Sequence, residues 1–285
     1  MPHFTAGLYD SQTVLITGGA TGIGFAMARA FGLHGAQVVL ASRNAERLAA
    51  AAGRLTALGI ENDTVVCDVR DEAAVKAAVA RAVSRFGTID VLVNNAAANF
   101  WSPAETMSAR SFRTVVEIDL YGTFHTTRAV VPHMIEQGGG AILNVAITDP
   151  QRGLPYFAHA AAAKSGVVAL TATWAAEWGR YGIRVNALGP GPTPTENAVG
   201  GMAVGRPDHP PSFERQRLRT PLRRLATPED SASAALFLCS DAAGHITGVN
   251  LPVDGGISLP LPSGDLNFDH AAATPRQHEE TTKSE

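Results

Sequence analysis

The chain has 285 residues, of which 45% are hydrophobic and 17% charged, a balance that fits one globular α/β domain with a large core. The formal net charge of −3 excludes a strongly basic protein and no apolar run is long enough to span a bilayer, so we expect neither a nucleic-acid partner nor membrane insertion. The two cysteines, Cys67 and Cys239, form neither a disulfide framework nor a metal-ligand pattern, which predicts no metal site and a cytoplasmic location.

The first predicted elements form a strand, a glycine-rich turn and a helix. An apolar run at Thr13–Thr17 predicts the strand, and a helical pattern covers about residues 22–34. Glycines in the turn between them allow a tight bend, a close approach of the backbone to a pyrophosphate and close packing of the helix. The predicted cofactor contacts in this stretch are Thr17, Gly18, Thr21, Gly22, Ile23 and Gly24. The alternative is an ordinary loop between a strand and a helix.

Alternating elements continue to residue 253. Further strands are predicted at Gln37–Ala41, Asp63–Cys67, Ile89–Asn94, Ala141–Ala146, Arg184–Leu188 and Val249–Val253. Helical patterns cover about 44–58, 71–86, 108–136, 157–180 and 227–240, and Asp71 and Thr227 stand where they would cap two of these helices. Because each strand is a nearly continuous Val/Ile/Leu run, the sheet is expected to be parallel and covered on both faces. We therefore predict an α/β protein: a single domain over residues 1–257 with a doubly wound seven-stranded parallel sheet and helices on both faces.

The end of the second strand bears on the choice of cofactor. A site that prefers NAD usually has an acidic residue there, bonded to the ribose 2′-hydroxyl. This chain has Ala41-Ser42 instead, and Arg43 follows. A guanidinium pairs well with a 2′-phosphate, so we predict NADP(H) as the cofactor. The alternative for Arg43 is a solvated surface arginine.

Polar and small residues follow the third and fourth strands. Asp68 stands where it could accept a hydrogen bond from the adenine amine. Asn94 could connect neighbouring strands, and the small side chain of Ala96 would let the backbone press against the cofactor. Both strand ends should lie at the same edge of a parallel sheet, so we expect these residues near one another.

Several motifs together resemble the short-chain dehydrogenase/reductase family. They are Thr17-Gly-Gly-Ala-Thr-Gly-Ile-Gly24, Asn94-Asn-Ala-Ala97, Lys164 and Pro190-Gly191, and the likeness covers about residues 10–257. The resemblance implies a Rossmann fold, a nicotinamide cofactor and a homotetramer. It also implies that Val69, Pro190, Gly191 and Thr193 contact the cofactor and that Lys164 holds the nicotinamide ribose.

The chain departs from the family at three of its four usual catalytic positions. Lys164 is kept, but Ala160 stands four residues earlier, where the family has its proton-donating tyrosine. Ile147 and Asp119 take the places of the usual serine and asparagine. A tyrosine and a lysine at this spacing share one helix face, which lets the ammonium lower the pKa of the phenol. Without the phenol, ordinary alcohol–ketone interconversion is disfavoured.

The stretches Asn94-Asn-Ala-Ala-Ala-Asn-Phe100, Cys67-Asp-Val-Arg-Asp71 and Ala176-Glu177-Trp178-Gly179 resemble 2,4-dienoyl-CoA reductases. The peroxisomal type of that enzyme carries an aspartate at the position of Asp119. The resemblance implies that NADPH reduces a conjugated dienoyl thioester. The alternatives are a trans-2-enoyl-CoA reductase, an ordinary ketoacyl or alcohol dehydrogenase of the same family, and a catalytically silent NADP-binding protein.

Three residues are candidates for the chemistry: Asn99, Asp119 and Lys164. Asn99 could donate a hydrogen bond to the enolate oxygen that forms when the dienoyl thioester is reduced, or it could only stabilise its loop. Asp119 could supply a proton, since a carboxyl group in a partly apolar cleft has a raised pKa. The alternative for Asp119 is that it only orients Lys164.

The substrate is expected beyond these groups. Residues 193–224 are predicted to include a substrate lid, because the stretch to Pro211 is rich in glycine and proline, and 258–285 form a C-terminal tail. Phe100 and Tyr156 are candidate substrate contacts. Arg70 matches an arginine that meets CoA phosphate in mitochondrial-type dienoyl reductases. Arg206 begins a group of arginines that could bind CoA phosphates or form a solvated basic surface, so an acyl-CoA is the expected substrate.

Overall fold

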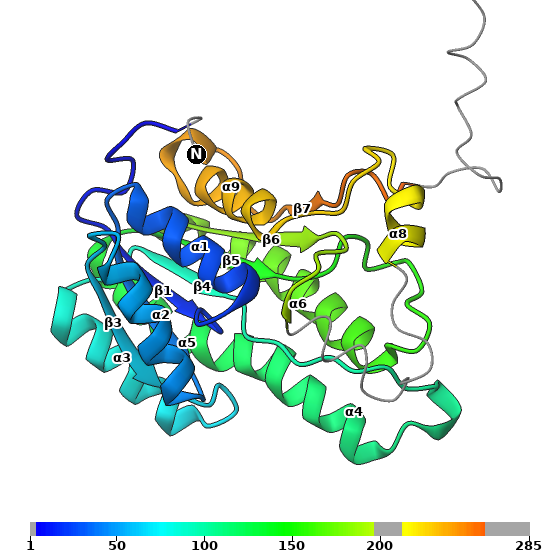
Figure 1. Ribbon diagram of the computed structural model, residues 1–285. Helices are drawn as coiled ribbons and strands as arrows, with labels where there is room; N and C mark the ends of the chain where they lie inside the picture. The colour runs from blue at the N-terminus through cyan, green and yellow to red at the C-terminus, as the bar shows by residue number, and fades with distance from the viewer. Residues whose placement is uncertain (1–3, 197–212, 260–285) are drawn as a thin grey trace, which may run out of the picture.

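The computed structural model describes residues 4–196 and 213–259, which fold around one seven-stranded parallel sheet (Figure 1). The strand order is β3-β2-β1-β4-β5-β6-β7. The strands are β1 (Thr13–Thr17), β2 (Gln37–Ser42), β3 (Asn62–Val66), β4 (Val91–Asn94), β5 (Gly140–Val145), β6 (Ile183–Pro190) and β7 (Asn250–Val253). The predicted doubly wound α/β fold is confirmed, and the predicted strand bounds agree to within two residues at every end.

Helices cover both faces of the sheet. The helices of the described residues are α1 (Gly22–Leu33), α2 (Ala45–Thr56), α3 (Glu72–Phe86), α4 (Ala109–Val116), α5 (Gly122–Gln137), α6 (Ala158–Trp178), α8 (Phe213–Arg219) and α9 (Pro228–Cys239), of which α4 and α8 lie off the sheet. Single 3₁₀ turns lie at Ala104–Thr106, Gly179–Tyr181 and Asp241–Ala243. Both predicted caps are confirmed: Asp71 accepts from two N–H groups of α3, and Thr227 forms a capping box with Asp230 on α9.

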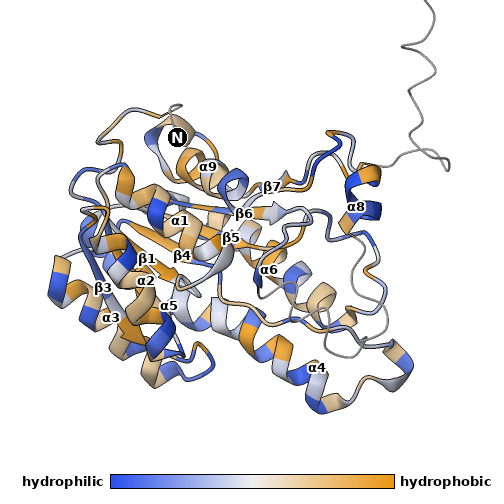
Figure 2. Ribbon diagram, viewed as in Figure 1, coloured by the Kyte–Doolittle hydropathy of each residue, from blue (hydrophilic) through white to orange (hydrophobic). Residues whose placement is uncertain are grey.

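The core consists of two layers separated by the sheet. One layer packs α1, α2 and α9 against the sheet, and the other packs α3, α5 and α6. Successive side chains of a strand point to opposite faces, so Val14 and Ile16 enter the first layer and Leu15 the second. The central strands are correspondingly hydrophobic in Figure 2. Burial on both faces is why these strands are continuous apolar runs instead of alternating patterns.

The strand order reverses next to β1, which pairs with β2 on one side and β4 on the other. Ligands of open parallel sheets bind at such a switch point, outside the carboxyl ends of the strands. The turn after β1 and the loop after β4 therefore meet there: Thr17 and Asn94 are paired in the sheet register.

The helical pattern predicted over 108–136 is interrupted in the structure. A π-helical turn, Glu117–Tyr121, lies between α4 and α5, and the N–H of Gly122 bonds to the carbonyl of Glu117, five residues back. A π-turn adds one residue to the helix and redirects the side chains around it. Asp119 lies inside this turn. The sequence pattern did not predict the interruption.

Two further regions complete the comparison with the sequence. The short helix α8 was not predicted, and 197–212 of the expected lid, with Arg206, and 260–285 of the expected tail lie outside the described residues. Across the described part of the chain, no helix combines the length and the hydrophobicity needed to cross a membrane.

Candidate active site

The glycine-rich turn after β1 has the shape of a cradle for a phosphate. Gly18 and Gly22 adopt positive φ angles of 65° and 53°, and a methyl group on Gly18 would come within 3.0 Å of the Cα atom of Ala96. The first turn of α1, from Gly22 to Phe25, consists of glycine and apolar residues. No carboxylate in this turn would therefore repel an anion bound by the N–H groups and the positive end of the helix dipole. These features fit the pyrophosphate of a dinucleotide.

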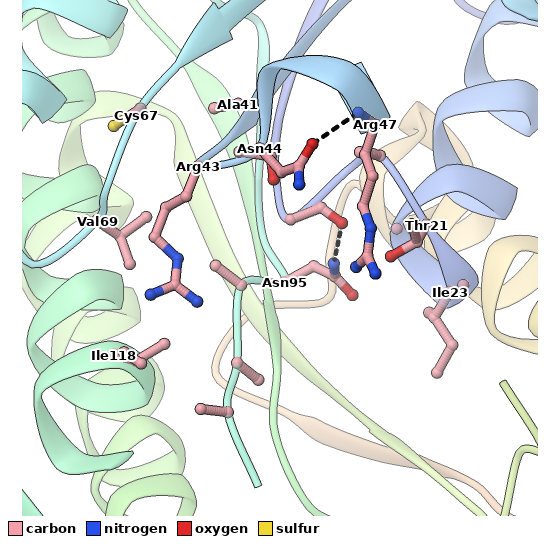
Figure 3. A pocket seen from close by; sticks show the side chains of 18 of the residues that line it. Thr21, Ile23, Ala41, Arg43, Asn44, Arg47, Cys67, Val69, Asn95 and Ile118 are labelled. Carbon is pink, nitrogen blue, oxygen red and sulfur yellow. Dashed lines mark hydrogen bonds between the residues drawn. The ribbon is translucent and has the colours of Figure 1, made fainter. Parts of the chain in front are cut away.

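A cavity of about 760 Å³ opens beside this turn (Figure 3). Among the predicted site residues, those lining it are Gly18, Thr21, Gly22, Ile23, Gly24, Arg43, Asp68, Val69, Ala96 and Asn99. The cavity is also lined by Asn95, Ile118, Thr195 and Arg47, which the sequence analysis did not single out. Arg47 lies on the first turn of α2, four residues after Arg43, and both guanidinium groups extend into the cavity in Figure 3. That spacing was the available signal for Arg47.

Thr17 and Asn94 hold the framework around the cavity. The Thr17 hydroxyl accepts from the N–H groups of Asn95 and Ala96, at 3.0 and 3.1 Å. The Asn94 amide donates to Asn144 Oδ1 on β5 and to the Thr127 hydroxyl on α5, each at 2.8 Å. The prediction that Asn94 connects neighbouring strands is confirmed.

Asp119 and Lys164 meet at the buried side of the loop after β4. Lys164 Nζ lies 3.6 Å from Asp119 Oδ2 and donates to the carbonyl of Val145 at 2.7 Å. Asp119 Oδ1 accepts from the N–H of Ala98 at 2.7 Å. Asp119 is 1% exposed and Lys164 6%, and Ala160 is buried one helical turn before Lys164. The carboxyl group therefore both faces the lysine and anchors the loop that carries Asn99.

Burial sets the protonation of this carboxyl group. It raises the pKa of Asp119, while the Lys164 ammonium and the Ala98 N–H act in the opposite direction. Of these effects burial is the largest, because an ionised carboxylate loses its hydration in such a place. Asp119 can thus retain a proton at a higher pH than an exposed aspartate. The geometry is compatible with an acid role and with the alternative that Asp119 orients Lys164.

The loop from Asn99 to Ser102 packs against the start of α6. The Phe100 ring meets His159 edge-on, with 4.4 Å between ring centroids, and Trp101 stacks on Tyr156 at 4.6 Å. His159 is fully buried, which lowers its pKa, and its Nδ1 accepts from the N–H of Ala160 at 2.6 Å. The two predicted substrate contacts, Phe100 and Tyr156, thus each take part in a ring pair between this loop and the start of α6. Tyr156 precedes α6 and is 45% exposed.

The remaining predicted contacts lie elsewhere. Arg70 binds Asp68 at the end of β3, with Nη2 2.6 Å from Asp68 Oδ2. In the arginine group around α8, Arg217 pairs with Glu214 and Arg224 with Asp230. Pro190, Gly191 and Thr193 continue from the end of β6, where a methyl group on Gly191 would come within 2.6 Å of the Cα atom of Asp254.

Comparison with known proteins identifies the family. A family model described as Enoyl-(Acyl carrier protein) reductase, which represents short-chain dehydrogenases/reductases, matches residues 18–258. The chain belongs to the short-chain dehydrogenase/reductase family. It is accordingly an oxidoreductase that uses a nicotinamide cofactor, as the cradle after β1 indicates.

Three relatives within the family show the range of its activities. The rat peroxisomal 2,4-dienoyl-CoA reductase [(3E)-enoyl-CoA-producing] is 40% identical, covering 95% of this chain and 92% of its own. A probable 2,4-dienoyl-CoA reductase [(2E)-enoyl-CoA-producing] of Bacillus subtilis is 39% identical, covering 87% and 96%. D-threitol dehydrogenase of Mycolicibacterium smegmatis is also 39% identical, covering 88% and 94%.

Solved structures agree on the fold. Levodione reductase superposes with a TM-score of 0.85 at 37% identity, covering 89% of this chain and all of its own. An actinorhodin polyketide ketoreductase with NADPH has a TM-score of 0.82 at 33% identity, covering 89% and 99%. Neighbours of this likeness include ketone-reducing enzymes, so the fold supports the family and leaves the substrate to the site residues.

Proposed function

We propose that the chain reduces a carbon–carbon double bond of an unsaturated fatty acyl-CoA with NADPH, in the manner of a 2,4-dienoyl-CoA reductase. The observation that carries this proposal is the buried Asp119–Lys164 pair beside Ala160. A carbonyl reductase of this family needs a phenol at the position of Ala160, whereas a site that protonates carbon can use a carboxylic acid. The names of the rat and Bacillus subtilis relatives point the same way.

Asn99, Lys164 and Asp119 have different proposed roles in the reduction. The nicotinamide cofactor, when bound, supplies the hydride for the far end of the conjugated system. Negative charge then develops on the thioester oxygen, and the amide of Asn99 and the ammonium of Lys164 are the proposed groups that stabilise it. Asp119, whose pKa is raised by burial, is the proposed proton donor, directly or through a water molecule. Protonation next to the carbonyl leaves the remaining double bond between C3 and C4.

The preference for NADPH over NADH is part of the proposal. Arg43 lines the large cavity just after β2, where an acidic residue would favour NADH. Its guanidinium is the proposed partner of the 2′-phosphate. NADPH in the actinorhodin ketoreductase structure supports this choice within the family.

The decisive experiment measures oxidation of NADPH with dienoyl-, enoyl- and ketoacyl-CoA at equal concentrations. We expect kcat/KM to be highest for the dienoyl thioester, with NMR showing a 3-enoyl product. A higher value for the monoene would favour an enoyl thioester reductase, which the family description also suggests. Rapid oxidation of simple secondary alcohols would contradict the proposal, and D-threitol is the first alcohol to include. Tight NADPH binding with no turnover on any thioester would indicate a silent protein.

Assembly and compartment remain predictions. A homotetramer is expected from the family, and light scattering of the purified protein would test it. The rat relative is described as peroxisomal, whereas the composition of this chain predicts the cytoplasm. Fractionation of the source cells would decide between them.

A further inference from the structure

A carboxylate just after β3 is approached by two guanidinium groups. Asp68 accepts from Arg70 Nε at 3.0 and 3.1 Å, from Arg70 Nη2 at 2.6 Å and from the Arg70 N–H at 3.0 Å. Arg43 Nη1 lies 4.0 Å from Asp68 Oδ2, the oxygen that Arg70 Nη2 also contacts. Both carboxylate oxygens of Asp68 thus accept hydrogen bonds from Arg70, whereas Arg43 lies at the limit of an ion pair.

The two arginines occupy different cavities. Asp68 and Arg43 line the large cavity beside the glycine-rich turn. A second cavity of about 440 Å³ is lined by Asp68, Arg70 and Tyr121, among others. Arg70 does not line the large cavity itself, but it binds Asp68, which lines both cavities. Its hydrogen bonds are also the main reason that the pKa of Asp68 lies below its ordinary value, which favours the ionised carboxylate.

We propose that Arg70 is a positioning residue for cofactor selection: by neutralising Asp68, it leaves the Arg43 guanidinium available for the 2′-phosphate of NADPH. This inference rests on the NADPH preference proposed above. It differs from the role in CoA binding that the resemblance implied for Arg70. The bonds to Asp68 use Nε and Nη2 of Arg70, so the guanidinium keeps further N–H donors and the two roles do not exclude each other.

The physical reason lies in what Asp68 would do alone. An uncompensated carboxylate at this place would repel a 2′-phosphate and would draw Arg43 from its distance of 4.0 Å into a direct ion pair. NADH has no 2′-phosphate and would be little affected. Arg70 and Asp68 side chains are 39% and 29% exposed, so solvent screens the interaction and the expected effect is modest.

The test measures dissociation constants of NADPH and NADH by the fluorescence of the reduced nicotinamide, in the absence of acyl thioester. For R70A we expect the NADPH constant to rise roughly fivefold and the NADH constant to change less than twofold. R70K, which keeps a positive charge, should retain most of the preference. The double variant D68N/R70A, compared with D68N alone, is the critical control. Because D68N leaves no carboxylate for Arg70 to neutralise, the two variants should bind NADPH equally well. The amide introduced by D68N still has an oxygen that can accept from the backbone N–H two residues later, which preserves the turn.

Each failure is distinguishable. If the unmodified protein binds NADH as tightly as NADPH, both the proposed cofactor preference and this inference are wrong. If NADPH is preferred but R70A binds both cofactors normally, only the inference fails. Normal cofactor binding in R70A together with a raised KM for acyl-CoA would assign Arg70 to the substrate instead. The inference would also fail if removing Arg70 weakened NADPH binding by the same factor in the unmodified protein and in D68N. Such a result would show that Arg70 does not act through Asp68.

Discussion

Single positions decide the chemistry of this molecule. Ala160 offers no proton, and two buried groups nearby can hold one: Lys164 on the same helix and Asp119 on another element. Asp119 comes from the π-helical turn and Lys164 from α6, and the packing of these two elements places Nζ 3.6 Å from Oδ2.

Two substitutions separate the acid role of Asp119 from its role in the loop. D119N keeps an oxygen that can accept from Ala98 but has no acidic proton, whereas D119A removes both functions. We expect kcat with a dienoyl thioester to fall about 100-fold or more in both variants. NADPH affinity should stay within about twofold in D119N, since the loop is retained. Turnover of D119N close to that of the unmodified protein would show that Asp119 only orients its neighbours.

The pH dependence of the reaction follows from the same carboxyl group. Burial raises the pKa of Asp119 above its ordinary 3.8, so the fold favours the protonated form. Between the pKa of Asp119 in the unfolded chain and its higher pKa in the folded protein, the folded protein binds more protons. The contribution of Asp119 to stability is therefore lost as the pH rises from the lower of these pKa values through the higher one. We expect kcat to fall with rising pH as the acid ionises. Chemical denaturation of D119N should show a flatter stability profile there, and an unchanged profile would rule out the raised pKa.

At the level of whole elements, β1, its glycine turn and α1 act as one unit. Close contact between the turn and the loop after β4 leaves no room for side chains at some glycines. A methyl group on Gly24 would lie 2.5 Å from the carbonyl oxygen of Gly18 and would also strike the amide of Asn95. That amide donates to the carbonyls of Thr17 and Gly18, so it braces the cradle.

We therefore expect G24A to lower the free energy of unfolding by about 1–3 kcal/mol and to weaken nucleotide binding, because the cradle must open to accept the methyl group. G53A is the matched control. Gly53 lies within α2, where an added methyl group would meet no neighbouring atom within 4 Å, so alanine should stabilise the helix by roughly 0.5–1 kcal/mol. Urea denaturation and cofactor titration measure both effects. Equal nucleotide affinity in the two variants would contradict the cradle.

In the molecule as a whole, the cavity joins elements that are distant in the chain. The turn after β1, the arginines after β2, Asp68 after β3 and the loop after β4 all line it. A cofactor that contacts all of them links their stabilities, since it binds the folded state and not the unfolded chain. The fold and the binding of cofactor should therefore be measurable in one experiment.

Thermal unfolding in the presence of cofactor is that experiment. At a concentration 100 times its Kd, NADPH should add about 2.7 kcal/mol to the free energy of unfolding, which is roughly 5–10 °C in Tm for a domain of this size. NADH at the same concentration should give a smaller shift if Arg43 binds the 2′-phosphate. R43A should reduce the difference between the cofactors. An equal shift with NADH would contradict the predicted preference.

Much of the fold was predictable because its signals are local. Continuous apolar runs marked the strands, and Asp71 and Thr227 marked helix starts, since burial and capping depend on neighbouring residues. The π-helical turn was missed because its residues fit a regular helical pattern. The short helix α8 was missed because the Gly/Pro-rich stretch before it shows no period.

The sequence by itself determined the strand–helix alternation, the phosphate cradle and the loss of the usual phenol at Ala160, since each depends on residue types at short, regular spacing. Only the tertiary structure decided which charged and polar groups meet: Asp119 with Ala98 and Lys164, and Phe100 with His159. It also engaged Arg70 with the nearby Asp68, on the cofactor side. The physical reason is that electrostatic and hydrogen-bond partners act over a few ångströms in space, and the packing of helices on the sheet sets those distances.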